Sequence, residues 1–324
     1  MPDITYREAV TRALREALKD PRVFMMGEDI GAYGGPYAVT KGFIHEYGED
    51  RIKDTPISES VIVGAGIGAA LAGLRPIVEI MTINFTLLAM DQIVNHAAKL
   101  RYMSGGQLSV PLVVRTVTGG GAQLAATHSQ NFEGWYAHVP GLKVVVPATP
   151  YDALGLFRSV MKEQDPVIFV EHIRLYSTRG PVPDEPYTVP LGKAEVKREG
   201  SDLTLVAYSR MVHVALAAAQ QLEQEGISAE VVDLRTLRPL DAATVVASVR
   251  KTHRAVVVEE DWLTGGFGAE VVSRIQEGAF DHLDAPVGRV GGVEVPMPYA
   301  SNLEEAAIPS PERVVKRAKE LLGA

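Results

Sequence analysis

Glu59 and His128 are the two residues of the chain whose type and position best suit acid–base chemistry. Glu59 stands between Ser58 and Ser60, at the predicted start of a helix. A carboxylate there could be a partly buried general acid or base that hydrogen-bonds a ring nitrogen of a ligand. It could also simply complement the helix dipole and the free amides of the first turn. Taken alone, the residue favours the second interpretation.

His128 follows the triple glycine Gly119–Gly121, which ends a predicted buried strand. In open α/β sheets, ligands bind at the loops that follow the carboxyl ends of the strands. A histidine in such a loop is a good candidate for proton transfer. No His-x-x-x-His pair and no suitably spaced acidic residue accompanies it, so neither a zinc site nor a hydrolase triad is supported.

Two glycine-rich segments could bind phosphate groups. Residues 64–69 match the loose dinucleotide pattern G-x-G-x-x-A, but a turn precedes them and Asn84-Phe85 stands where an acidic ribose ligand belongs. We therefore interpret them as a closely packed helix of small residues. Residues 265–268 are favoured as a strand-to-helix turn over a phosphate site.

The elements around these residues predict an α/β fold. A Thr5–Glu8 capping box opens the first helix, and Thr149-Pro150 opens another. Further helices are expected at 64–74 and 86–102, and strands at 23–26, 77–81, 112–117, 142–146 and 167–170. Strands that alternate with helices indicate a parallel, doubly wound sheet.

A proline-rich stretch without periodicity, residues 174–190, is interpreted as a linker. Beyond it, strands are expected at 203–208, 229–233 and 255–259, and helices at 212–222, 241–249 and 268–276. Because domains average about 150 residues, 324 residues predict two of them. We place them at 1–185 and 186–324.

Composition excludes several classes of protein. The 40 acidic and 32 basic side chains give a net charge of -8 without a basic cluster, which argues against a nucleic-acid partner. The absence of cysteine excludes disulfides, thiolate metal sites and cysteine nucleophiles. The longest apolar run, 61–74, is too short for a membrane span, and the start lacks a signal-peptide pattern. We therefore expect a cytoplasmic protein with no membrane partner.

Long stretches of the chain resemble one family, the beta subunits of the thiamine-diphosphate-dependent, decarboxylating component of 2-oxo acid dehydrogenase complexes. They run in order over nearly the whole chain and include MGEDIGAYGGPYAVTKGF, DTPISESVIVGAGIGAALAGLRPIVEI, THSQNFEGWYAHVPGLKVVVPATPYDA and VVVEEDWLTGGFGAE. The resemblance implies a doubly wound pyrimidine-binding α/β domain followed by a transketolase-like C-terminal α/β domain. It also reverses the preference at Glu59 and His128.

The resemblance implies a role for each candidate residue. Glu59 stands where the family's carboxylate hydrogen-bonds the aminopyrimidine ring of thiamine diphosphate. His128 matches the histidine that handles protons as the acyl group passes to a lipoyl arm. Further cofactor contacts are implied for Glu28, Asp29, Ser58, Ser60, Met81 and Phe85. The acyl pocket is expected at Asn84, Thr86, Leu87, Leu88 and His128.

The chain lacks the GDG segment and the paired asparagines that hold Mg²⁺ and the diphosphate in thiamine-diphosphate enzymes. It is therefore expected to supply half a site and no metal ligands. The resemblance implies an alpha subunit that supplies the Mg²⁺ site in an α₂β₂ heterotetramer, and a lipoyl-bearing acyltransferase core. The segments at 64–73 and 86–102 are candidates for subunit contacts. Some family members also hold K⁺ through main-chain carbonyls, here near 110–113 and 160–165.

The preferred substrate is harder to predict from the sequence, because one methylene group in an apolar pocket changes the binding free energy by only ~1–3 kcal/mol. The apolar pair Leu87-Leu88 favours a branched-chain 2-oxo acid of the 2-oxoisovalerate type, with pyruvate or acetoin dehydrogenase as the alternative. Two other classes stay open. A nicotinamide dehydrogenase would bind its cofactor with this chain alone, and a noncatalytic scaffold subunit would tolerate Glu59→Gln.

Overall fold

The computed structural model describes residues 1–323, which form two compact units. The first unit contains Met1–Thr118 and Trp135–Leu191, and the second contains Gly119–Gly134 and the chain from Gly192 onward. The segment that carries His128 thus groups with the second unit. The domain boundary at 185 and 186 stays a prediction, because a compact unit in space need not be a domain that folds alone.

The first unit is built on parallel strands in the order β6-β7-β5-β4-β2-β3. Their bounds are β2 Val23–Gly27, β3 Ile52–Asp54, β4 Arg75–Ile80, β5 Val113–Thr118, β6 Lys143–Val145 and β7 Val167–His172. Every residue of β4, β5 and β7 is buried. These continuous buried runs are typical of a parallel sheet covered on both faces.

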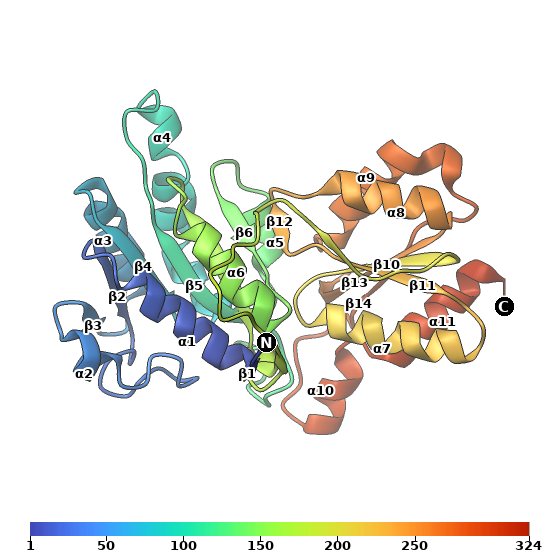
Figure 1. Cartoon of the computed structure of the whole chain (residues 1–324), viewed down its shortest axis with the longest axis horizontal. Helices are drawn as coiled ribbons and strands as arrows, with labels where there is room; N and C mark the ends of the chain where they lie inside the picture. Colours follow the sequence, from blue (N-terminus) through green and yellow to red (C-terminus); the bar gives the residue numbers. More distant parts are fainter. Residues whose placement is uncertain (324) are drawn as a thin grey trace. The chain divides into compact units, whose positions relative to one another are not determined.

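The helices of the first unit begin where local signals predict. In α1 (Tyr6–Ala17) the Thr5–Glu8 capping box is formed, with the Thr5 amide donating to the Glu8 carboxylate at 2.7 Å. Thr149 caps α6 (Pro150–Val160), which lies beside α1 (Figure 1). The stretch interpreted as a linker also contains β8 (Arg179–Pro181), which pairs antiparallel with β1 (Asp3–Thr5). Shorter helical segments are α2 (Phe43–Tyr47) and η3 (Ile173–Leu175), and α5 (Glu133–Ala137) contains residues of both units.

The helix of small residues is α3 (Glu59–Leu71), which begins at Glu59 as predicted and ends at residue 71 instead of 74. A side chain on Gly66 would bring a Cβ atom to 2.7 Å from Val78 Cγ1 and 3.0 Å from Leu112 Cδ1. The glycine therefore lets the helix lie close to the sheet, and the packing interpretation is confirmed. Because residues 64–69 lie inside the helix and not directly after a strand, they do not form a dinucleotide turn.

The single long helix predicted at 86–102 is wrong. This stretch contains a 3-10 helix η1 (Ile83–Ala89), a π-helix η2 (Gln92–Ala97) and a short α4 (Leu100–Met103). The Thr86 hydroxyl donates to the Ile83 carbonyl and accepts from the Tyr136 hydroxyl, both at 2.5 Å. These side-chain bonds compete with a regular helix, and hydrophobic spacing does not reveal them.

The second unit has its own sheet, in the order β14-β13-β10-β11-β9, with only the edge pair β11 and β9 antiparallel. Its strands are β9 Glu195–Arg198, β10 Leu203–Ala207, β11 Ala229–Asp233, β13 Ala255–Trp262 and β14 Gly288–Gly292, and β12 is the short Thr236–Arg238. Its helices are α7 Met211–Gln224, α8 Ala242–Thr252, α9 Gly268–Ala279, η4 Phe280–His282, α10 Ser301–Ala307 and α11 Pro311–Leu322. Helices α7 and α11 pack together, as do α8 and α9, on opposite faces of the sheet (Figure 1).

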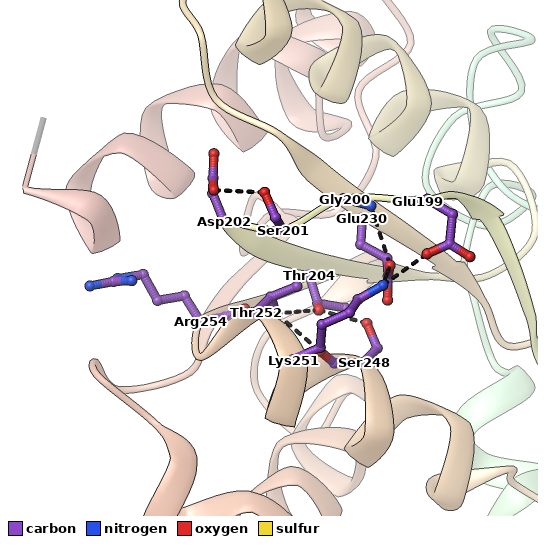
Figure 2. Close-up of polar contacts among 10 residues, drawn as sticks. All are labelled: Glu199, Gly200, Ser201, Asp202, Thr204, Glu230, Ser248, Lys251, Thr252 and Arg254. Carbon is purple, nitrogen blue, oxygen red and sulfur yellow. Dashed lines mark hydrogen bonds and ion pairs between the residues drawn. The ribbon is translucent and has the colours of Figure 1, made fainter.

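A polar cluster ties α8 to the amino ends of strands β10 and β11 (Figure 2). The buried Thr204 hydroxyl lies 2.7 Å from the hydroxyls of both Ser248 and Thr252. Lys251 pairs with the buried Glu230 and with Glu199. Because ligands bind at the carboxyl ends of such strands, we interpret this cluster as structural. None of the helices in residues 1–323 has the length and apolar character that a membrane crossing requires.

Candidate functional site

Most of the predicted cofactor contacts in the first unit lie at one edge of the sheet. Strand β2 pairs with β3 on one side and β4 on the other, and the three run parallel. Glu28 and Asp29 come directly after β2, and Met81 directly follows β4. Glu59 begins α3, the first helix after β3. The topology thus gathers these residues where α/β sheets bind ligands.

Glu59 is only 6% exposed. In residues 1–323 its carboxylate has neither a hydrogen-bond donor nor an ion-pair partner. The carboxyl oxygens are therefore open to a hydrogen bond from another molecule, although most of the side chain is buried. The position therefore suits a hydrogen-bond donor that comes from outside the chain. An aminopyrimidine ring fits this requirement, since it can share a proton with the carboxyl oxygen.

Glu28 and Asp29 add further acidic groups beside Glu59. Burial raises the pKa of Glu28, and the nearby carboxylates of Asp29 and Glu59 raise it further. Asp29 lies in the left-handed region, with a φ of 57°, so the chain turns sharply after β2. Because like charges repel, this edge favours a ligand that donates hydrogen bonds over one that carries negative charge.

The other predicted residues differ in how accessible they are. Met81, Phe85 and Ser58 are partly buried, and Ser60 is exposed. The predicted pocket residues Asn84 and Thr86 are buried, and both bond within the chain: the Asn84 amide nitrogens donate to Thr82 Oγ1 and Thr86 is held between Ile83 and Tyr136. Leu87 and Leu88 are 40% and 63% exposed. Their assignment to the acyl pocket stays a prediction.

His128 is exposed and belongs to the second unit. Its Nδ1 atom lies 2.9 Å from the hydroxyl oxygen of Thr127. This contact restrains the orientation of the imidazole ring. The loop that carries His128 is fixed by two residues that sequence reasoning missed, Glu260 and Glu304. They are 140 and 183 residues from the glycines they contact, so no local signal could reveal them.

The side chains of residues 1–323 do not bring three His, Asp or Glu groups together as a metal site needs. The region expected to hold K⁺ contains a cationic side chain of the chain itself. Arg75 Nη2 donates to the carbonyls of Met161 and Glu163, both at 2.6 Å. Because two of the carbonyls in this region already bind a guanidinium, a potassium ion would need other oxygens.

Comparison with known families covers both units. Residues 2–178 match the transketolase pyrimidine binding domain, and residues 192–314 match the transketolase C-terminal domain. Among solved structures, the chain is similar to a split-gene transketolase described as an inactive beta4 tetramer, with a TM-score of 0.80 and 25% identity. That alignment covers 99% of this chain and 98% of the other. The predicted fold, with pyrimidine-binding and transketolase-like C-terminal α/β domains, is confirmed.

Closer relatives are found among subunits of dehydrogenase complexes. The chain is 50% identical to the mitochondrial pyruvate dehydrogenase E1 component subunit beta-2 of Oryza sativa subsp. japonica, over 98% of this chain and 86% of the relative. It is 47% identical to the pyruvate dehydrogenase E1 component subunit beta of Rhizobium meliloti (strain 1021), over 98% of this chain and 70% of the relative. The chain therefore belongs to the thiamine-diphosphate-dependent family of beta subunits of pyruvate dehydrogenase-type 2-oxo acid dehydrogenases, which work with an alpha subunit and further complex partners.

Proposed function

We propose that the chain is the beta subunit of a pyruvate dehydrogenase. In an α₂β₂ heterotetramer with its alpha subunit, it takes part in oxidative decarboxylation of pyruvate and acetyl transfer to a lipoyl group on an acyltransferase core. One observation carries the proposal: Glu59, a residue only 6% exposed at the ligand-binding edge of the sheet, has a carboxylate that lacks a partner in residues 1–323.

The chain's own residues divide the work at the cofactor. Thiamine diphosphate, when bound, supplies the nucleophilic carbon and the electron sink for decarboxylation. Glu59 shares a proton with the nitrogen of the pyrimidine ring and so controls the ring's protonation. Phe85 and Met81 offer partly buried apolar surface to the ring, and Glu28 adds to the acidic surroundings of Glu59.

Further roles fall to the other predicted residues. Asp29, Ser58 and Ser60 complete the surroundings of the ring. In acyl transfer the lipoyl S–S bond breaks, one sulfur receives the acyl group, and the His128 imidazole gives a proton to the other sulfur. Mg²⁺ and the diphosphate are assigned to the alpha subunit, because this chain lacks the GDG segment and the asparagine pair.

Pyruvate is preferred over a branched-chain 2-oxo acid for two reasons. The relatives in plants and in Rhizobium meliloti are named as pyruvate dehydrogenase subunits. In addition, the Leu87-Leu88 pair, on which the branched-chain expectation depends, has a large exposed fraction in this chain and does not by itself enclose an apolar pocket. A branched-chain acid and acetoin remain the alternative substrates to be measured.

Reconstitution with the alpha subunit tests the proposal. The complex, loaded with thiamine diphosphate and Mg²⁺, is assayed for lipoyl acylation with pyruvate, 2-oxoisovalerate and acetoin. We expect kcat/KM to be at least about tenfold higher for pyruvate than for 2-oxoisovalerate. A difference of this size is what one or two methylene groups allow. Preference for 2-oxoisovalerate would restore the branched-chain assignment. If Glu59→Gln and His128→Ala complexes both keep full turnover, the chain is a scaffold subunit.

A further inference from the structure

The loop that carries His128 is fixed by buried carboxylates from the C-terminal part of the chain. Glu304 lies on α10 and is 2% exposed, and Glu260 lies on β13 and is 6% exposed. All of these residues belong to the second unit. We infer that Glu304, assisted by Glu260, is a positioning residue that holds the His128 loop in its working conformation. This inference rests on the proposed role of His128.

The carboxylates bind three backbone amides at the start of the loop. Glu304 Oε1 accepts from the amide of Gly121 at 2.8 Å, and both of its oxygens accept from the amide of Gln123 at 3.1 Å. Glu260 Oε1 accepts from the amide of Gly120 at 2.8 Å. Hydrogen bonds from backbone amides to a carboxylate are stronger than those between neutral groups. The two carboxylates, which we call the anchor, therefore hold the start of the loop through three backbone amides.

The conformation that these bonds hold is an unfavourable one. Gln123 and Ala125 have φ values of 56° and 64°, in the left-handed region that side chains disfavour. Such residues persist only where the surrounding structure over-determines them, and they gather at functional sites. The hydrogen bonds from the amides of Gly121 and Gln123 to Glu304 hold the backbone in this conformation. Without them, the chain would relax toward ordinary backbone angles.

The packing around Gly120, at the start of the loop, also indicates that α10 helps to position the loop. A Cβ atom on Gly120 would lie 2.9 Å from Met297 Cε and 3.1 Å from Ile308 Cδ1. The backbone at Gly120 is thus pressed against these side chains, one of which follows α10 directly. Glu304 and Ile308 are one helical turn apart, and the Ile308 amide donates to the Glu304 carbonyl at 3.2 Å. Helix α10 and its flank therefore form a platform for the loop.

The anchor reaches His128 through a short stretch of chain. The His128 amide donates to the carbonyl of Ala125 at 3.3 Å, only two residues after Gln123. His128 is exposed, so the path of the loop backbone contributes to its position in addition to the Thr127 contact. A displacement of about 1 Å of a catalytic group can cost about a hundredfold in rate. Loss of the anchor is therefore expected to act on turnover and leave substrate binding largely intact.

The test compares Glu304→Ala, Glu304→Gln and Glu305→Ala in the reconstituted holoenzyme. Glu305 is the exposed neighbour on the same helix and serves as the matched control. We expect Glu304→Ala to lower kcat for lipoyl acylation by about ten- to a hundredfold, with KM for the 2-oxo acid changed less than about twofold. Glu304→Gln keeps an acceptor oxygen and is expected to recover a substantial part of the rate. Glu305→Ala should match the wild type.

Hydrogen exchange of peptides that cover residues 119–131 separates this inference from the role of His128. We expect exchange in these peptides to be at least about tenfold faster in Glu304→Ala, with peptides of β10 and β11 unchanged. If Glu304→Ala does not assemble, the same exchange measurement on Glu304→Gln replaces it. Unchanged exchange and unchanged kcat would overturn the inference. Faster exchange together with a fully active His128→Ala complex would confirm the anchor and reject the catalytic role of His128.

Discussion

Glu59 and Glu79 are two carboxylates of the same unit, buried to nearly the same extent, at 6% and 5% exposure. Glu79 pairs with Arg115, which also binds Glu171 at 2.5 and 2.8 Å. Tyr176 completes the cluster by donating to Glu171 at 2.8 Å. Glu59 has no such partner within residues 1–323.

The difference separates structural acids from functional ones. At Glu79 the free-energy cost of removing the carboxylate from water is offset by the guanidinium of Arg115. The ion pairs of Arg115 therefore link the neighbouring strands β4, β5 and β7. Glu59 has no such cation in residues 1–323, so its carboxylate is open to a donor from another molecule. Burial alone would not distinguish the two residues, whereas the presence or absence of a partner does.

The largest effect is expected from Glu59→Gln. If Glu59 is the proton partner of the cofactor ring, the change lowers kcat of the reconstituted complex by about a hundred- to ten-thousandfold. Its melting temperature should change little, because Glu59 makes no side-chain hydrogen bond or ion pair within residues 1–323 that the change would remove. Glu79→Gln is the matched control, with the same chemical change at similar burial, and should keep near-normal kcat. Equal losses in the two variants would contradict the distinction.

Breaking the structural cluster should produce the opposite pattern. Arg115→Met leaves Glu79 and Glu171 buried without their cation, and the free energy of unfolding should fall by about 3–5 kcal/mol. Denaturant unfolding of the chain measures this loss. Activity per folded complex should change little. A loss below about 1 kcal/mol would show that the cluster is not the structural element described above.

Asp261, in the second unit, is intermediate between Glu59 and Glu79. Among the described residues its carboxylate accepts one hydrogen bond, from the Trp262 amide at 2.8 Å. Burial raises its pKa to about 7. Because the folded protein binds this proton more tightly than the unfolded chain, stability falls as pH rises from about 4 to about 7 and stays reduced above that. Asp261→Asn should therefore stabilise the chain by about 2–4 kcal/mol at pH 8 and by much less at pH 4.5. The melting temperatures of the wild type and Asp261→Asn at pH 8 and pH 4.5 measure this stabilisation. A stabilisation of the same size at both values of pH would contradict the prediction.

The smallest effect is expected at the edge of the cluster. Tyr176→Phe removes a hydroxyl that donates to a buried carboxylate, which should cost about 1.5–3 kcal/mol of unfolding free energy. The stacking of ring 176 on Tyr37, with centroids 5.2 Å apart, is retained. Tyr6→Phe is the control, since its hydroxyl only approaches the Pro147 carbonyl at 3.4 Å, and should cost less than about 1 kcal/mol. A similar loss of unfolding free energy in Tyr176→Phe and Tyr6→Phe would mean that the charge on Glu171 does not strengthen its hydrogen bond with Tyr176.

Local signals predicted most of the fold. The capping box at Thr5 and the proline after Thr149 define helix starts within a few residues, and apolar runs define the central strands. Long-range contacts were out of reach: the bond between Tyr136 and Thr86 joins residues 50 positions apart, and the stretch 86–102 is not the single helix expected. The edge strands β9 and β14 and the helices α10 and α11 were not predicted either.

The candidate site shows the same division. Residue type and position alone left Glu59 as a first-turn carboxylate, and only the family resemblance assigned it a role. Its missing partner is a property of the folded unit, which no sequence pattern contains. Glu304 was missed because it approaches Gly121, 183 positions away in the sequence, only in the folded second unit.

The central claim is that Glu59 receives its partner from a cofactor bound in a shared site. Isothermal titration of thiamine diphosphate with Mg²⁺ tests it most directly, with four samples: the lone chain, its mixture with the alpha subunit, and the same mixture with Glu59→Gln or Glu79→Gln. We predict no binding to the lone chain, binding in the mixture, a Kd about ten- to a hundredfold weaker with Glu59→Gln, and an unchanged Kd with Glu79→Gln. Tight binding to the lone chain, or equal affinity with Glu59→Gln, would contradict the account.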